Sequence, residues 1–208
     1  MKMKVKRMLT ILLAVILVFA MAIPAFAAGD TSASYTQVSL EGAPQVTGTF
    51  TVYLSVKSNY IDNSNTYISR HLLPVSMGST GTTKTYYVRD VLVAAMSQYN
   101  ALQFKDNSGT PITSSSTYVY GVSDSSVSPT LTFAPVTGID YYNGWMFRVN
   151  GKYPLLNSED WPSGWSPSDG PCGAGISEAY VIDGDVIDFY FADTASLAKA
   201  TAFTRIDS

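Results

Sequence analysis

The sequence predicts an α+β protein in which a mostly antiparallel sheet packs against one main helix. Three observations lead to this fold class. Six or seven short segments have the composition and spacing of strands, and turn signals separate them. One segment, residues 88–99, repeats its apolar side chains at the spacing of a helix. Another segment, residues 154–177, is rich in Pro, Gly and Ser and indicates a long irregular loop.

The chain opens with the pattern of a secretory signal peptide. Four basic residues precede an apolar run over residues 8–23, and Ala25-Phe26-Ala27 follows as a small-residue cleavage site. A retained anchor is less favoured, because a spanning helix needs about 20 apolar residues. We therefore expect residues 1–27 to be removed, leaving an extracellular protein without a membrane span, either released or held loosely at the cell envelope. Residues 28–45 are small and polar, which is typical of a flexible leader.

Composition restricts the partners. The signal holds four of the 13 Lys and Arg and none of the 16 Asp and Glu, which leaves a net charge near −7. This charge repels polyanions, so nucleic acid is not an expected partner. The lone cysteine, Cys172, cannot form an internal disulfide. Packing alone must then stabilise one domain of ordinary size.

The first strand is expected at residues 45–57, where apolar and polar side chains alternate. Its apolar positions are Val46, Phe50, Val52, Leu54 and Val56. An Asn- and Ser-rich loop is expected to follow over residues 58–69. In the helix that comes next, Asp90 lies in the first turn, where a negative charge suits the positive end of the helix dipole. The apolar face of that helix consists of Val88, Val91, Leu92, Ala95 and Tyr99.

Short strands and tight turns make up the rest of the chain. Strands are expected at residues 117–122, 131–136, 144–149, 179–182 and 185–191, and the C-terminal segment 194–208 adds a last strand or a tail. Asn150-Gly151 predicts a two-residue hairpin turn, because both central positions of that turn favour positive φ. Asp183-Gly184 predicts a second turn of the same kind.

An ordered set of motifs is similar to a known family. The chain carries YYVRDVLVAAM, then NGWMFRVNGKYP, then AYVIDGDVIDFYF. Their shared signature is a Trp, a hydrophobic residue and Val-Asn-Gly, followed later by an Asp-Gly-Asp turn before an apolar strand. It falls on Trp145, Met146, Val149, Asn150, Gly151, Asp183, Gly184, Asp185, Val186 and Ile187. Over roughly residues 46–193 the chain resembles a bacterial family of secreted and cell-surface modules of unknown function, related to the C-terminal β-domain of transcobalamin and intrinsic factor.

The resemblance implies a β-grasp-like sheet wrapped on one helix, and a role as a ligand-binding or adhesive module. In the vitamin carriers the β-domain closes over cobalamin against a separate helical barrel. A single amphipathic helix is evident in this sequence, so cobalamin is carried over by analogy alone. The resemblance assigns no cobalamin contact to any position in this chain.

Aromatic residues are the main candidates for a ligand site. Trp145 and Phe147 share one face of a strand, which predicts that they belong to the core. Trp161 and Trp165 fall in the irregular loop, where they form either a binding surface or a lid over the sheet. The candidate ligand-binding residues are Tyr141, Tyr142, Tyr153, Trp161 and Trp165.

Other chemistry has less support in the sequence. Asp183, Asp185 and Asp188 offer carboxylates, but their spacing lacks the oxygen set of a calcium loop, so we expect no metal. Cys172 and His71 are the lone cysteine and histidine, and a thiolate nucleophile would need the two side by side. Acids for glycan hydrolysis are available at Glu159, Asp160 and Glu178. Solvated surface charge is the simpler explanation of these acids.

Three functions remain open at this point. The first is a non-enzymatic extracellular module that binds a small molecule, a glycan or a surface protein through the aromatic loop. The second is a secreted hydrolase acting on a glycan or on the cell wall, with corrinoid binding as the alternative that the resemblance implies. The third is an envelope component that self-associates through a sheet edge, for which residues 202–206 are a candidate strand.

Overall fold

The computed structural model describes residues 35–58, 68–126, 128–132, 134–135, 142–166 and 172–192. By its contacts the chain divides into two units, residues 1–32 and 33–208, and every described residue belongs to the second. The expected signal peptide, most of the loop at 58–69 and the C-terminal strand lie outside the described residues. No helix in the described part is both long enough and apolar enough to cross a membrane.

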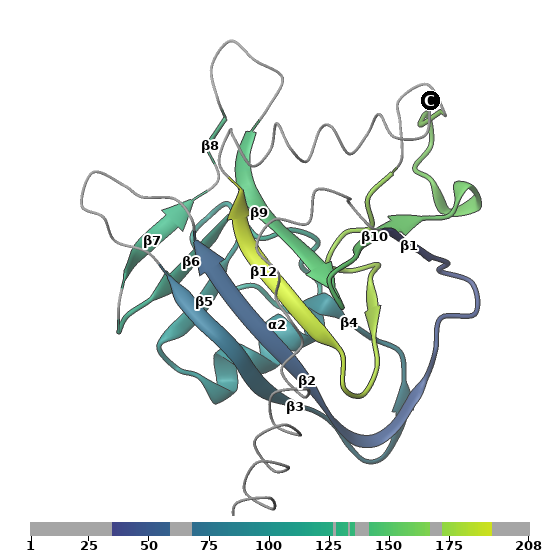
Figure 1. The fold of residues 1–208 in the computed structure, drawn as a ribbon, viewed down its shortest axis with the longest axis horizontal. Helices are drawn as coiled ribbons and strands as arrows, with labels where there is room; N and C mark the ends of the chain where they lie inside the picture. Colours follow the sequence, from purple (N-terminus) through teal and green to yellow (C-terminus); the bar gives the residue numbers. More distant parts are fainter. Residues whose placement is uncertain are drawn as a thin grey trace, which may run out of the picture. The chain divides into compact units, whose positions relative to one another are not determined.

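The main sheet has five strands in the order β3-β2-β12-β9-β8 (Figure 1). They are β2 (Val46–Ser58), β3 (Ser69–Lys84), β8 (Ala134–Pro135), β9 (Tyr142–Val149) and β12 (Val186–Ala192). Neighbours are antiparallel except at the centre, where β12 runs parallel to β2. The central pair therefore joins the first and the last long strand of the described chain.

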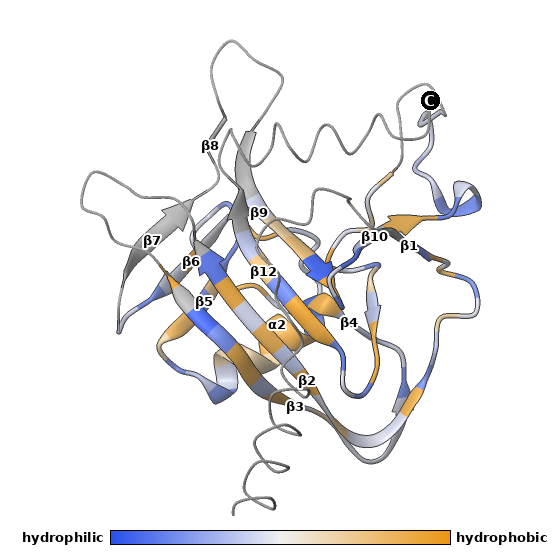
Figure 2. Ribbon diagram, viewed as in Figure 1, coloured by the Kyte–Doolittle hydropathy of each residue, from blue (hydrophilic) through white to orange (hydrophobic). Residues whose placement is uncertain are grey.

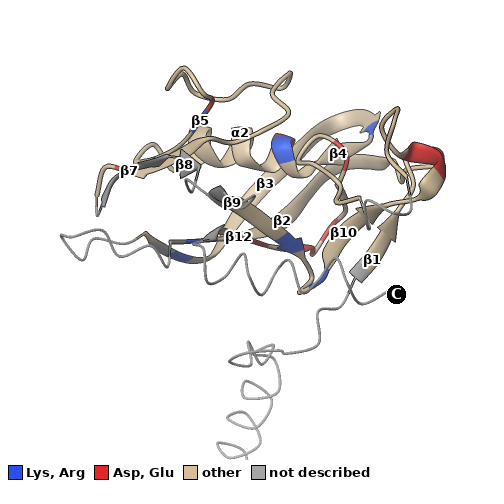
Figure 3. Ribbon diagram, turned by 90° about the horizontal axis from the view of Figure 1, so that it is seen from above, with Lys and Arg blue, Asp and Glu red and all other residues tan. Residues whose placement is uncertain are grey.

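The expected helix is α2 (Val88–Gln98). Its side chains at Val88, Val91, Leu92 and Ala95 are fully buried, as the apolar spacing predicts. The Asp90 carboxylate accepts a hydrogen bond from the Tyr87 N–H at 2.9 Å and so satisfies a backbone donor at the start of the helix. Figure 3 shows α2 on one side of the layer formed by β3, β2, β12 and β9. We call that side of the sheet the helix-covered face.

Smaller sheets surround this layer. β5 (Leu102–Lys105), β6 (Gly121–Asp124) and β7 (Ser128–Thr132) form an antiparallel sheet. β1 (Tyr35–Val38) pairs in parallel with β10 (Tyr153–Leu156), and β4 (Tyr86–Tyr87) pairs with β11 (Tyr180–Val181). The single turn η1 (Ser158–Asp160) follows β10. The α+β class with a mainly antiparallel sheet is therefore confirmed for the described part of the chain.

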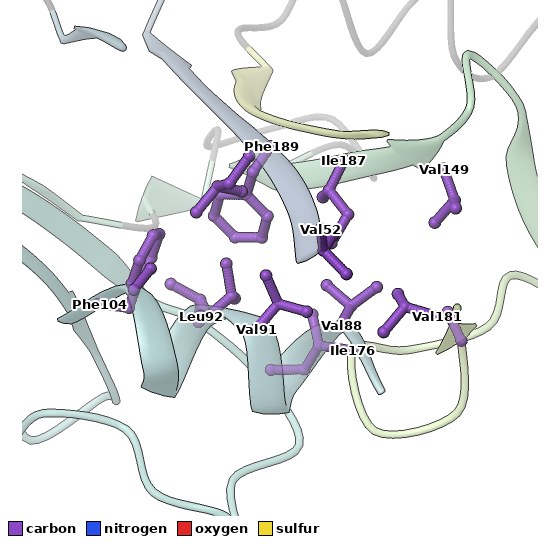
Figure 4. Close-up of a cluster of buried hydrophobic side chains, with 14 of the residues drawn as sticks. Val52, Val88, Val91, Leu92, Phe104, Val149, Ile176, Val181, Ile187 and Phe189 are labelled. Atoms are coloured by element: carbon purple, nitrogen blue, oxygen red, sulfur yellow. The ribbon is translucent and has the colours of Figure 1, made fainter. Parts of the chain in front are cut away.

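The core lies between the helix-covered face and α2 (Figure 4). Val52, Ile187 and Phe189 point from the sheet toward Val91 and Leu92 of the helix, and all five are almost completely buried. The alternation that predicted β2 is confirmed at Phe50, Val52, Leu54 and Val56, which are all buried. It fails at Val46, which is only partly buried, and at Ser55, which has the polar parity but is completely buried. Figure 2 shows the same alternation as apolar and polar segments along β2 and β12.

Strand β3 is the longest strand described, and the sequence pattern does not reveal it. Its 16 residues include Pro74, Gly78 and Gly81 and lack regular alternation. The strand forms because β2 supplies its partner over most of its length, with gaps at residues 71–72 and 80–82, and its outer position among the described strands tolerates a proline that has no N–H to donate. Gly78 is required where β3 approaches β2, because its φ is +76° and a Cβ there would lie 2.1 Å from the Gly48 carbonyl oxygen.

Two expected irregular segments are partly regular. The leader expected at residues 28–45 contains β1, and the loop expected at 154–177 begins with three residues of β10. The reason is mutual burial: Val38 and Leu156 are both buried and stand opposite each other in the parallel pair. Neither segment could show this from its own pattern. The strand expected at 117–122 is shifted, because β6 begins only at Gly121.

Candidate functional site

The five candidate aromatic residues do not form one described surface. Tyr141 lies outside the described residues. Tyr142 opens β9 opposite Pro135, and its side chain is also outside the description. Tyr153 is only 7% exposed, so its ring is not available as a stacking surface, contrary to expectation. Trp161 and Trp165 remain, in a segment that we call the Trp loop, residues 157–166.

Trp161 holds the Trp loop to the body of the protein. Its indole Nε1 donates a hydrogen bond to the Leu156 carbonyl at 3.1 Å, and its ring is partly buried against the core. Burying most of an aromatic ring while satisfying its one donor is a stable arrangement for tryptophan. The lid interpretation therefore describes Trp161 better than the binding interpretation.

Trp165, in contrast, presents its ring to the surface, with 41% of the residue exposed. Its backbone N–H donates to the Pro162 carbonyl at 3.0 Å, which closes a turn just before the ring. The start of the loop is tied to the β1 end, because the Asn157 N–H donates to the Val38 carbonyl and the Leu40 N–H to the Asp160 carboxylate. The loop thus holds an exposed indole on a backbone fixed at several points.

Tyr153 belongs to a different group, on the side of the sheet away from α2, which we call the opposite face. Nη2 of Arg148 donates to the Tyr153 hydroxyl at 2.8 Å, and the guanidinium carbon lies 4.4 Å from the centre of that ring. The Tyr153 and Tyr190 hydroxyls share a further hydrogen bond. Burial, followed by the influence of Tyr153, raises the pKa of Tyr190 well above its ordinary value. Burial alone would lower the pKa of Arg148, but the two tyrosines outweigh it and raise the pKa.

The Asn150-Gly151 turn is confirmed, with φ of 53° and 76° at its two residues. Its flanking residues Val149 and Lys152 exchange two backbone hydrogen bonds. The Asn150 side chain also joins the turn to β12: its amide donates to the Asp185 carboxylate at 2.8 Å, and its oxygen accepts from the Val186 N–H at 2.9 Å. Asn150 and Asp185, predicted as structural motif residues, are therefore direct partners.

Asp183-Gly184 is a turn of another kind, and the expectation of a second identical hairpin is wrong. Gly184 has φ of +82°, but Asp183 is not among the residues with positive φ. The flanking strands β11 and β12 pair with other strands and not with each other. Asp183 instead accepts a hydrogen bond from the Thr51 N–H at 3.0 Å, so its carboxylate anchors the turn to β2.

Among the remaining acidic and sulfur candidates in the described residues, Glu178 has a structural partner and Cys172 is buried, whereas Oδ1 of Asp188 is buried without a hydrogen-bond partner. Within the described residues no group of three His, Cys, Asp or Glu is arranged to hold a metal ion. Glu178 accepts a hydrogen bond from the Gly175 N–H at 2.7 Å. Cys172 is buried, and burial together with the charge of Glu178 raises the pKa of its thiol, which disfavours the thiolate. His71 lies on β3 and is exposed, and Glu159 is exposed in η1.

Two polar groups escaped the sequence interpretation. Arg70 binds the fully buried Asp124 through two hydrogen bonds, and Ser126 donates to the same carboxylate. Burial would raise the pKa of Asp124, but these hydrogen bonds lower it. No local pattern joins residues 54 positions apart. The group of Arg148, Tyr153 and Tyr190 was easier to predict from the sequence. Strand alternation alone places Arg148 and Tyr190 on the polar faces of their strands.

No protein-family model, no curated protein and no solved structure matches this chain. The resemblance to the transcobalamin β-domain therefore stays a prediction, and function has to be argued from the geometry.

Proposed function

We propose that this chain is a non-enzymatic extracellular binding module with a β-grasp-like core, and that the exposed ring of Trp165 is its main ligand contact. The extracellular location is proposed from the signal pattern of residues 1–27. The ligand class is one with a flat, weakly polar face, such as a sugar ring or a corrin ring, because such a face gains most from stacking on an indole.

The strand order supports the β-grasp-like description. The hairpin β2-β3 leads into α2, which packs on one face, and β12 returns to lie parallel to β2 between β2 and β9. A sheet wrapped on one helix is what the resemblance implies. It leaves residues 162–165, which follow β10, at the surface of the protein, where binding residues are commonly found.

The contrast among the three tryptophans carries the functional proposal. Trp145 is buried in the core and Trp161 is anchored by its indole N–H, whereas Trp165 is 41% exposed. The hydrogen bonds at Asn157, Asp160 and the Trp165 N–H hold the backbone of the Trp loop before a ligand arrives, and such preorganisation lowers the entropy lost on binding.

A binding screen with matched variants tests the proposal. The protein is titrated with a set of oligosaccharides and with cyanocobalamin, and binding is followed by calorimetry. Trp165→Ala should weaken the binding of whichever probe is retained by roughly 30-fold, since loss of an aromatic anchor costs about 2 kcal/mol. Tyr118→Ala is the control, because Tyr118 is equally exposed, at 42%, but lies on a different segment.

Three results would contradict the proposal. One is that the wild-type protein retains no probe. Another is that Trp165→Ala and Tyr118→Ala affect binding equally. The third is turnover: release of shorter sugars from an oligosaccharide would favour the hydrolase alternative, and variants at Glu159 and Glu178 would then locate the acids.

A further inference from the structure

The Asn150-Gly151 turn contains both groups of a covalent reaction, the deamidation of asparagine. Glycine after asparagine favours this reaction, because no side chain hinders the approach of the glycine nitrogen. The Gly151 nitrogen bonds to the side-chain carbonyl carbon of Asn150, and the amide nitrogen leaves as ammonia, taking the proton of the Gly151 N–H. Water then opens the five-membered imide at one of its two carbonyl carbons, which gives aspartate or isoaspartate.

The attacking nitrogen and water both have access to the turn. Asn150 and Gly151 are exposed, and a Cβ built on Gly151 would have no heavy atom within 4 Å beyond its chain neighbours. The two backbone hydrogen bonds of the turn join Val149 and Lys152, so within the described residues the Gly151 N–H has no partner. Any restraint on the reaction must therefore act on the Asn150 side chain.

The Asn150 carboxamide is held at both of its polar atoms. Its nitrogen donates to Oδ1 of Asp185 at 2.8 Å, and its oxygen accepts from the Val186 N–H at 2.9 Å. Asp185 is itself fixed, because it is only 8% exposed and its Oδ2 accepts from the Ile182 N–H at 2.8 Å. Closing the imide ring draws the carboxamide onto its own backbone and away from these partners, so the hydrogen bonds oppose the reaction.

We infer that Asn150-Gly151 is a deamidation site that Asp185 holds in check, and that reaction there releases the turn from β12. The product has a carboxylate at position 150 in place of the amide that donates to Asp185. Two negatively charged acceptors then face each other without a proton between them, and Asp185 is buried. Isoaspartate also adds one carbon to the backbone of a two-residue turn, which disturbs the bonds between Val149 and Lys152.

Peptide mapping by mass spectrometry, on protein kept at mildly alkaline pH, tests the restraint. Asn150 should deamidate roughly 30-fold more slowly in the folded protein than in guanidinium chloride, the factor that two hydrogen bonds are worth. Asp185→Ala should accelerate the reaction about tenfold in native buffer, because the bond to a charged acceptor is lost. Asp183→Ala is the matched control, since it alters the neighbouring turn but not the contacts of Asn150. It should react as wild type.

An internal reference separates a local effect from general loosening. Asn107 is exposed and precedes Ser108, far from Asp185 in the sequence, and Asp185→Ala should leave its rate unchanged. Equal rates for Asn150 in the folded and unfolded wild-type protein would overturn the inference without any variant. Acceleration of Asn150 in Asp183→Ala as large as in Asp185→Ala would also overturn it.

The consequence of the reaction is tested with Asn150→Asp, which imitates the aspartate product. Its urea midpoint should be lower than that of the wild-type protein. Asn150→Asp/Asp185→Asn should recover about half of the loss or more, because an amide at position 185 can donate to position 150 while its oxygen still accepts from the Ile182 N–H. A wild-type midpoint for Asn150→Asp, or no recovery in the double variant, would show that charge at position 150 does not release the turn.

Discussion

On the helix-covered face of the main sheet, Ile187 and Phe189 lie in an apolar core, whereas on the opposite face Arg148, Tyr153 and Tyr190 are joined by hydrogen bonds and ring contacts. Ile187, Phe189 and Tyr190 lie on β12, whereas Arg148 lies on β9 and Tyr153 on β10. Apolar packing has no preferred partner, so a buried ring can be replaced by another of similar volume. Hydrogen bonds have fixed donors and acceptors, and each loss leaves a particular group unsatisfied. We therefore expect the helix-covered face to supply most of the free energy of folding. The hydrogen bonds of the opposite face instead select which side chains become partners.

The largest effect is expected on the helix-covered face. Phe189 stacks on Trp145, with ring centres 5.4 Å apart, and meets the edge of Phe104 at 5.5 Å. Phe189→Ala should lower the free energy of unfolding by about 3 to 5 kcal/mol, because it leaves a cavity between sheet and helix. Val186→Ala, on the same strand but the opposite face, should cost about 1 kcal/mol. Equal midpoints for the two variants in urea would refute the division between the faces.

A smaller effect is expected at the Asn150-Gly151 turn, which joins the end of β9 to the start of β12. Asn150→Gly keeps the positive φ but removes the hydrogen bonds to Asp185 and Val186. It should cost about 2 kcal/mol, since two bonds are lost and the Asp185 carboxylate is buried. Asp183→Ala, in the Asp183-Gly184 turn, removes the one hydrogen bond from the Thr51 N–H. It should lower the free energy of unfolding by about half as much as Asn150→Gly. Chemical unfolding that ranks Asp183→Ala above Asn150→Gly would contradict this account.

The smallest effect at neutral pH, and a distinctive pH dependence, are expected on the opposite face. Tyr190→Phe should cost roughly 1 kcal/mol by removing one hydroxyl partner. The folded protein raises the pKa of Tyr190, so its contribution is complete below the ordinary tyrosine pKa near 10 and is lost as pH rises further. The wild-type protein should therefore lose stability more steeply above pH 10 than Tyr190→Phe. If the urea midpoints of the wild-type protein and of Tyr190→Phe fall in parallel from pH 8 to 11, Tyr190 does not cause the pH dependence.

The comparison also separates what local pattern can reveal from what it cannot. Strand β2, helix α2 and strand β12 follow from periodicity, because each has one apolar face that must be buried. The Asn150-Gly151 turn follows from its need for positive φ. Strands β1 and β3 have no such signature, since they are strands only because β10 and β2 supply their hydrogen bonds. At the candidate site, the positions of Trp161 and Trp165 in one loop were predictable, but their different exposure was not.

By itself the sequence determined the class of fold, the burial of Trp145 and the turn at Asn150, because periodicity and backbone conformation are properties of neighbouring residues. Tertiary structure alone decided that Tyr153 is buried beside Arg148, that Trp161 is anchored while Trp165 is exposed, and that Gln98 reaches the edge of β3. The contact between Gln98 and Ser76 joins residues 22 positions apart in the chain. The contacts of Tyr153 with Arg148 and of Trp161 with Leu156 span only five residues, but both rings are covered by packing that involves other segments. Such contacts form only when the sheet and the helix bring the segments together.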